Sequence, residues 1–320
     1  MIDSGALVHY GTIGATIALG AAGIAIGEGI IATHAMQAQY DQPHAHREIS
    51  RISFIAMALT ETAAILALTI MIIMFLTVNP TAANFAAQAI ARLGIMFAVG
   101  CSGFAVGIVS AMPAGAAAMA VARQPLIANK IMNIMLLTMT IIQTPIIFGF
   151  LVGLLIHTTA TTITTTLEAW RLCAAGIAIG IGAIGPVVGQ GIFARVACTS
   201  IGIRRQGYKR IVSFALFSQA LIETPILLAC LVSFMLIGTV TITNYLQLTA
   251  ALVAACTIGI GTTVPGIAAG LVAARACQAM TDHPEQQADI TRTSLLVQTF
   301  LDTLPIYCLI ISLTLLLIAR

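Results

Sequence analysis

Long apolar stretches alternate with short polar segments along the whole chain. A helix needs about 20 apolar residues to cross the hydrocarbon core of a bilayer. Stretches of at least that length lie near residues 9–38, 50–78, 86–122, 130–157, 168–201, 210–240, 246–279 and 290–319. They lack the period-two alternation of a transmembrane barrel strand. The pattern predicts an all-α membrane protein with eight transmembrane helices.

A polar residue interrupts the middle of every second apolar stretch at a nearly constant spacing. These residues are Glu61, Gln143, Glu223 and Asp302, and each is followed by a threonine: Thr62, Thr144, Thr224 and Thr303. Counting back one identical interval from each of the four gives Glu28, Ser110, Gln190 and Ala269, which all lie in the preceding apolar stretch. This repeat predicts four tandem helical hairpins, over residues 1–80, 81–160, 161–242 and 243–320.

Glycines are concentrated in the first helix of each predicted hairpin. The second helices carry only Gly149, Gly153 and Gly238 and are rich in Ile, Leu, Met and Phe. Small residues let helix backbones approach closely in lipid. We therefore expect the first helices to form a tightly packed inner row and the second helices a lipid-facing outer row, together forming an arc of a ring. Ordinary small-residue packing within a monomeric bundle is the alternative.

Composition and charge agree with a membrane protein. The chain is 59% hydrophobic and 8% charged, with a mean hydropathy of +1.03, which excludes a soluble globular protein. A net charge of +3 is too small to suggest a nucleic-acid partner. Of 14 Lys and Arg residues, 11 lie in or beside the loops inside the hairpins. The positive-inside rule places these loops in the cytoplasm and both termini on the opposite side.

Three carboxyl groups are predicted at one depth in the membrane, on Glu61, Glu223 and Asp302. A charged group there is costly, so each should be neutral or cation-bound when it faces lipid and should release its ion beside a fixed positive charge. Such a group can carry a cation between two environments. A buried interhelical hydrogen bond is the alternative. Gln143 has no ionisable group, and its counterpart Ser110 is also neutral, so the second hairpin is predicted to be an inactive spacer.

Several short motifs are shared with a known family. The third hairpin reads GIAIGIGAIGPVVGQG over 176–191, the second carries ARQP at 122–125, and equivalent loops read YDQP at 40–43 and TDHP at 281–284. The fourth hairpin has PIY ending at Tyr307, whereas the third loop, around 204–208, departs from the pattern. In register, these motifs resemble four fused copies of the rotor-ring c subunit, or proteolipid, of F-type ATP synthases.

This resemblance implies a rotor without enzyme activity of its own. Copies of the chain would form a ring in membrane lipids beside a stator a subunit, and its rotation would drive ATP synthesis in a separate head; the chain itself has no P-loop. It implies the ion carriers Glu61, Glu223 and Asp302, with Glu28, Gln190, Thr62, Thr224 and Thr303 as accessory ligands. It also implies a central-stalk contact at Arg123, Gln124, Pro125, Gln42 and Pro43, for which a solvated turn is the alternative.

The transported ion and the direction of transport remain open at this point. Oxygen ligands at Glu28 with Glu61, and at Gln190 with Glu223, would suit Na⁺. The Ala269 and Asp302 pair offers little beyond one carboxyl, so H⁺ is favoured as the ion that all three sites can bind. No resident metal or other cofactor is expected. One missing carboxylate in four is also familiar from vacuolar-type pumps, and a secondary transporter is the more distant alternative. An energy-converting membrane, such as a bacterial inner membrane, is the expected location.

Overall fold

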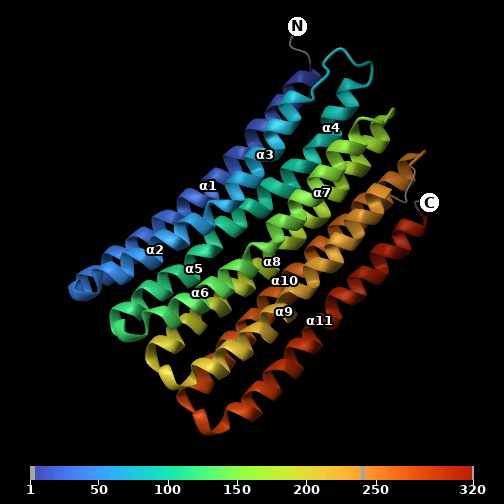
Figure 1. Ribbon diagram of the computed structural model, residues 1–320. Helices are drawn as coiled ribbons and strands as arrows, with labels where there is room; N and C mark the ends of the chain where they lie inside the picture. The colour runs from blue at the N-terminus through green and yellow to red at the C-terminus, as the bar shows by residue number, and fades with distance from the viewer. Residues whose placement is uncertain (1–3, 239–241, 319–320) are drawn as a thin grey trace.

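The computed structural model describes residues 4–238 and 242–318 as a row of helical hairpins (Figure 1). Within these residues, eight helical segments are long and apolar enough to cross a membrane, which confirms the predicted all-α membrane architecture. These segments are Ser4–Asp41, Pro43–Leu76, Phe85–Arg123, Pro125–Ala160, Thr166–Ile203, Arg205–Gly238, Tyr245–Asp282 and Pro284–Leu317.

The first helices of the hairpins form an inner row in chain order. They are α1 (Ser4–Asp41), α4 (Phe85–Ile95) continuing into α5 (Ser102–Arg123), α8 (Thr166–Ile203) and α10 (Tyr245–Asp282). A π-helical turn, Met96–Cys101, joins α4 to α5. Helix α1 packs on α5, α5 on α8, and α8 on α10. Figure 1 shows the first and last hairpins at opposite edges, so the row is open at both sides.

The second helices of the hairpins form the outer row. They are α2 (His46–Thr60) with α3 (Thr62–Leu76), α6 (Ala128–Ile142) with α7 (Thr144–Ala160), α9 (Tyr208–Gly238) and α11 (Gln287–Ile318). Contacts between successive outer helices are much sparser than those between inner helices. A close inner row and a looser outer row curve the layer, as expected for an arc.

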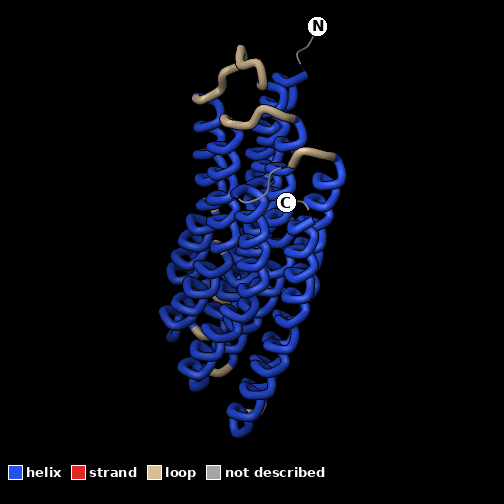
Figure 2. The backbone as a smooth tube through the Cα atoms, turned by 90° about the vertical axis from the view of Figure 1, so that its right-hand side faces the viewer, coloured by secondary structure: helices blue, strands red, loops and turns tan. Residues whose placement is uncertain are grey.

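The chain connections differ between the two ends of the helices. Each hairpin turns through one short 3₁₀ helix: Pro43–Ala45, Pro125–Ile127, Arg205–Gly207 and Pro284–Gln286. Proline at the start of three of these turns ends the preceding helix, because its ring fixes φ and it lacks a backbone donor. The longer connections between hairpins lie at the other end (Figure 2). The predicted domain boundaries at 80/81 and 160/161 fall in or next to the connections 77–84 and 161–165.

Glycine faces bring the inner backbones into direct contact. A Cβ atom placed on Gly107 of α5 would come within 2.6 Å of the Gly23 carbonyl carbon of α1. One placed on Gly266 of α10 would come within 2.6 Å of the Pro186 nitrogen of α8. Real side chains do not approach this closely. The inner row therefore depends on the absence of side chains at these crossings, as lipid-embedded helix packing requires.

Candidate ion-binding sites

The four repeat positions lie on the outer helices, and their inner counterparts lie on the first helix of the same hairpin. Glu61 and Gln143 occupy the α2–α3 and α6–α7 junctions, where one residue interrupts the regular helix. Glu223 and Asp302 lie within the continuous helices α9 and α11. The inner counterparts Ser110, Gln190 and Ala269 are fully buried, and Glu28 is partly buried. The fold thus repeats one polar position in every hairpin.

In the second hairpin, hydrogen bonds occupy the repeat position. The Gln143 amide Nε2 donates to Ser110 Oγ at 3.1 Å, and its Oε1 accepts from Thr62 Oγ1 at 3.1 Å. The side chain is 7% exposed. Gln143 therefore links the two helices of its own hairpin to each other and to Thr62 of the first hairpin. Its amide group is neutral, so it cannot carry an ion by ionising.

The third site combines residues from two hairpins. The Thr144 side chain of the preceding hairpin lies close enough to the Glu223 carboxyl group to interact with it. Thr224, assigned to this site by the resemblance, donates instead to Ala220 O in its own helix at 3.1 Å. The inner Gln190 is 0% exposed, yet neither of its amide atoms has a hydrogen-bond partner within the described residues. A buried unpaired amide costs about 1–3 kcal/mol, so this amide is suited to an ion or a water molecule.

A second glutamine, not identified from the sequence, lies one helical turn before Glu223. Gln219 is 0% exposed, and both of its amide atoms lack partners within residues 4–238 and 242–318. Residues four apart on a helix share a face, so Gln219 and Glu223 point to the same side of α9. The recurrence of glutamine four residues before the acid, as Gln219 and Gln298, was the available sequence signal.

The fourth site also contains such a glutamine. Gln298 Nε2 donates to Ser218 Oγ of the third hairpin at 3.2 Å and to Ser294 Oγ at 3.0 Å. Its Oε1 and the Asp302 Oδ1 are buried atoms without partners in the described part of the chain. Asp302 itself is 8% exposed. Gln298 therefore offers this site an oxygen that the inner Ala269 does not provide.

The first site has two carboxyl groups and an open side. The Glu28 and Glu61 carboxyl groups lie close enough to interact with each other. Glu61 is exposed and belongs to the first hairpin, whose helices α2 and α3 lie at one edge of the row (Figure 1). Among the described residues, Glu61 has no threonine partner of the kind that reaches Gln143 or Glu223 from another hairpin.

The loop residues implicated in stalk contact lie at the turns inside the hairpins. Gln42 and Gln124 directly precede the turns that begin at Pro43 and Pro125. The Gln124 side chain donates to Ile203 O at the end of α8, at 3.2 Å, which ties two neighbouring turns together. Arg123 is exposed beside it. A stalk contact at this loop stays a prediction.

Comparison with known families matches both ends of the chain. The family of the ATP synthase c subunit matches twice, over residues 12–74 and 252–315. The first and last hairpins of the chain are therefore similar to the ATP synthase c-subunit family. No curated protein matches the chain. The two matched ranges contain Glu28 with Glu61 and Ala269 with Asp302, and the two hairpins between them repeat the same interval between inner and outer positions.

The two matches to the ATP synthase c-subunit family support a general role. The eight apolar helices indicate an integral membrane protein, and the two matches are consistent with a fused, multi-copy rotor proteolipid, whose role in this family is not a catalytic one. Members of this family form a ring within ATP synthase. The open row of hairpins is the shape that a segment of such a ring requires.

Proposed function

We propose that the chain is a rotor component of an F-type ATP synthase and carries H⁺ on Glu61, Glu223 and Asp302. The observation that supports this most directly is the recurrence of these carboxyl groups at one depth, with the same interval separating each from its inner counterpart. A lipid-facing carboxyl group stays neutral by binding its ion, and it ionises beside the stator arginine. Alternation between these two environments during rotation couples ion flow to ATP synthesis.

Other parts of the proposal concern location and partners. The basic turns inside the hairpins face the cytoplasm of a bacterial inner membrane, where they meet central-stalk subunits, and the stator a subunit lies beside the outer row. Eleven of the 14 basic residues in or beside those turns support this orientation. The hydrogen-bonded Gln143 makes the second hairpin a spacer that passes the stator without an ion.

The decisive experiment removes all three carriers together. A ring with Glu61→Gln, Glu223→Gln and Asp302→Asn should lose ATP-driven H⁺ transport in vesicles while still assembling on native gels. Glu168→Gln is the matched control, because this carboxylate lies at the start of α8, far from the site position on that helix. Undiminished transport in the triple variant would overturn the proposal.

Na⁺ is the alternative ion, favoured by the unpaired amides at Gln190 and Gln219. A carbodiimide that modifies neutral carboxyl groups distinguishes the two ions. If millimolar Na⁺ at fixed pH slows modification of Glu223, the transported ion is Na⁺. If labelling depends on pH alone, the assignment to H⁺ stands.

A pump driven by ATP hydrolysis is the second candidate function. The observation that favours it is the spacer: with three carboxyl groups in four hairpins, fewer ions cross per ATP, and each can be moved against a steeper gradient. Purified enzyme in vesicles should synthesise ATP under an imposed ion gradient if it is a synthase. Hydrolysis-driven transport with no synthesis under any gradient would assign it to the pumps instead.

A further inference from the structure

A buried cluster of basic side chains joins the first two hairpins at the end of the helices away from the turns. His9 of α1 is 0% exposed, Arg92 of α4 is 1% exposed and His157 of α7 is 5% exposed. Arg92 Nη1 donates to His9 Nδ1 at 3.2 Å. The three side chains lie close enough to one another for their charges to interact. Three helices thus bring a guanidinium group and two imidazole rings to one place inside the protein.

The charge of Arg92 lacks a salt-bridge partner in the described part of the chain. Its other contact is a long one, of 3.5 Å from Nη2 to Gln88 Oε1. Arg171, at the next hairpin boundary, is buried as well, but it donates to two backbone carbonyls of α9 and lies close enough to Glu168 for their charges to interact. A buried charge without an opposite charge is unfavourable, so Arg92 requires a counter-charge that Arg171 does not.

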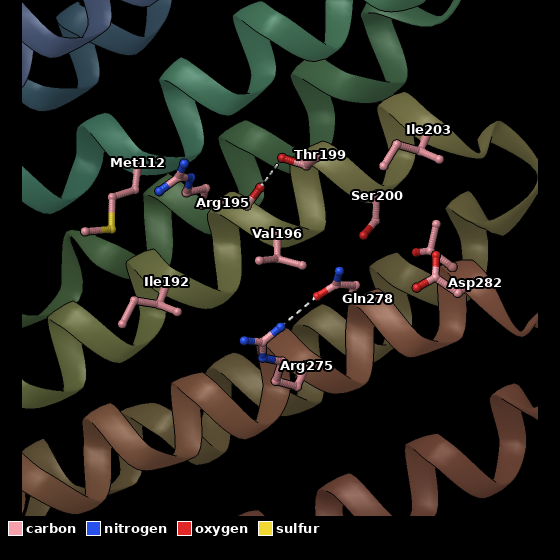
Figure 3. A pocket seen from close by; sticks show the side chains of 11 residues that line it. Met112, Ile192, Arg195, Val196, Thr199, Ser200, Ile203, Arg275, Gln278 and Asp282 are labelled. Atoms are coloured by element: carbon pink, nitrogen blue, oxygen red, sulfur yellow. Dashed lines mark hydrogen bonds between the residues drawn. The ribbon is translucent and has the colours of Figure 1, made fainter.

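Two other arginines of the inner row have a different environment. Figure 3 shows Arg195 and Arg275 beside a cavity of about 620 Å³. Both side chains are exposed, so their charge can be balanced from outside the protein. Arg92 is enclosed by protein, and its counter-charge must therefore lie inside the cluster.

The hydrogen bonds indicate which atoms of the cluster are unpaired. Arginine can only donate, so His9 Nδ1 accepts from Arg92, and the neutral ring of His9 carries its proton on Nε2. Thr77 Oγ1 donates to Ile73 O at 2.7 Å, so it accepts from His157 Nε2 at 3.0 Å. His9 Nε2, Arg92 Nε and His157 Nδ1 have no partner within residues 4–238 and 242–318. The first two of these atoms are N–H donors that lack an acceptor.

The cluster lies beyond the hydrocarbon core of the bilayer. Arg92 precedes the site position Ser110 by 18 residues, and His157 follows Gln143 by 14. At the helical rise, these intervals correspond to about 27 and 21 Å from the level of the ion sites. The core extends only about 15 Å from its centre. An ion dissolved in the water on this side can therefore reach the level of the cluster without crossing lipid.

We propose that Arg92 and His9 bind a small monovalent anion such as chloride through Arg92 Nε and His9 Nε2. The anion supplies the missing negative charge and accepts from two donors that the protein leaves unpaired. A water molecule can accept the same hydrogen bonds, but it has no charge to balance the guanidinium group. Since the side chains are almost fully enclosed, we expect a monatomic ion rather than phosphate. The bound anion stabilises the contact between the first two hairpins, whichever ion the rotor carries.

Thermal unfolding of the purified full chain, in chloride and in gluconate at equal ionic strength, tests this site. The wild type should unfold at a higher temperature in chloride, because a ligand that binds only the folded state stabilises it. Arg92→Gln should weaken the apparent affinity for chloride about tenfold, the effect of losing one hydrogen bond to a charged group. Arg171→Gln is the matched control. It removes the buried arginine that has carbonyl partners, so the chloride effect should remain even if the variant is less stable.

A direct binding measurement keeps the test decisive if Arg92→Gln does not fold. Broadening of the chlorine NMR signal by the protein reports exchange of chloride with the site. His9→Phe keeps the arginine but removes the Nε2 donor, and it should reduce this broadening relative to the wild type.

Three results would overturn the proposal. The first is an equal unfolding temperature of the wild type in chloride and gluconate, and the second is an unchanged chloride effect in Arg92→Gln. In either case the cluster holds no chloride and its unpaired donors bind water. The third is stabilisation by sulfate but not by chloride, since the site would then take a larger anion.

Discussion

A threonine hydroxyl from one hairpin reaches the polar group of the next at two of the internal boundaries. Thr62 donates to Gln143, and the Thr144 side chain lies beside the Glu223 carboxyl group. Each threonine directly follows the repeat position of its own hairpin. Each of these two sites is therefore built by two neighbouring hairpins. The threonine of the preceding hairpin is one of its components.

Replacing Thr144 should change the chemistry of Glu223. Thr144→Val keeps the side-chain shape but removes a hydrogen-bond donor to the carboxylate, which is worth about 1 kcal/mol. Carbodiimide labelling of Glu223 at fixed pH should become about fivefold faster, because the ionised form loses support. Thr224→Val is the control and should have no effect, since that hydroxyl bonds to Ala220 O in its own helix. Equal acceleration in both variants would contradict a site shared across hairpins.

The sequence located the polar positions but not all of their partners. Spacing along the chain is sufficient to find Glu61, Glu223 and Asp302, because a repeat preserves position. It pairs each acid with the next residue, whereas the contact at Glu223 comes from Thr144 in the preceding hairpin. Which hydroxyl reaches which carboxyl group depends on how neighbouring hairpins pack, and this information is absent from spacing within one hairpin.

At the scale of helices, close approach in the inner row depends on individual glycines. A Cβ atom on Gly27 would collide with Gly107 O of α5, whereas one on Gly29 would meet nothing within 4 Å. The sequence predicted that the inner row is rich in glycine, but it did not distinguish one glycine from another. The choice of essential glycines depends on the crossing points of the helices, which become visible only in the folded chain.

These two glycines form a matched pair for a stability test. Gly29→Ala should leave the melting temperature in detergent unchanged or raise it, since Ala favours a helix over Gly by about 1 kcal/mol. Gly27→Ala should lower it, because α1 must move away from α5 at a cost of about 1–3 kcal/mol for overpacking. Thermal unfolding of the purified chain measures both. Identical melting temperatures would show that the α1–α5 crossing tolerates a side chain.

Two arginines outside the basic turns also act at the scale of helices. Arg171 is buried and donates from Nη1 to Leu236 O and Ile237 O at the end of α9, at 2.5 and 2.9 Å. Arg92, 1% exposed, contacts His9 Nδ1 at 3.2 Å across hairpins one and two. Both arginines make contacts inside the protein. These contacts explain why the two residues lie outside the basic turns.

For the whole molecule, the spacer hairpin sets the number of ions per rotation. Gln143→Glu would place a fourth carboxyl group in a chain that has three at the repeat positions. The number of ions transported per ATP should rise by about one third, because the catalytic steps per rotation are unchanged while carriers increase from three to four per chain. Gln143→Leu is the control and should keep the original ratio. A ratio unaffected by the acidic substitution would show that the second hairpin is not a passive spacer.

Ring closure should complete the first site with a residue from the next copy of the chain. Head-to-tail interfaces close into rings when the rotation permits, and the free edge at Glu61 would then meet the free edge at α11. Thr303 holds the position equivalent to Thr62 and makes the same hydrogen bond to the carbonyl three residues before it. Since Thr62 also reaches Gln143, the same geometry lets Thr303 reach Glu61 of a neighbouring copy.

The variant Thr303→Val tests whether this residue completes the first site. It should accelerate carbodiimide labelling of Glu61 in assembled rings but not in dissociated chains. Glu223, with Thr144 in its own chain, is the internal reference, and acceleration at Glu61 in both states would place the effect within one chain rather than at the junction.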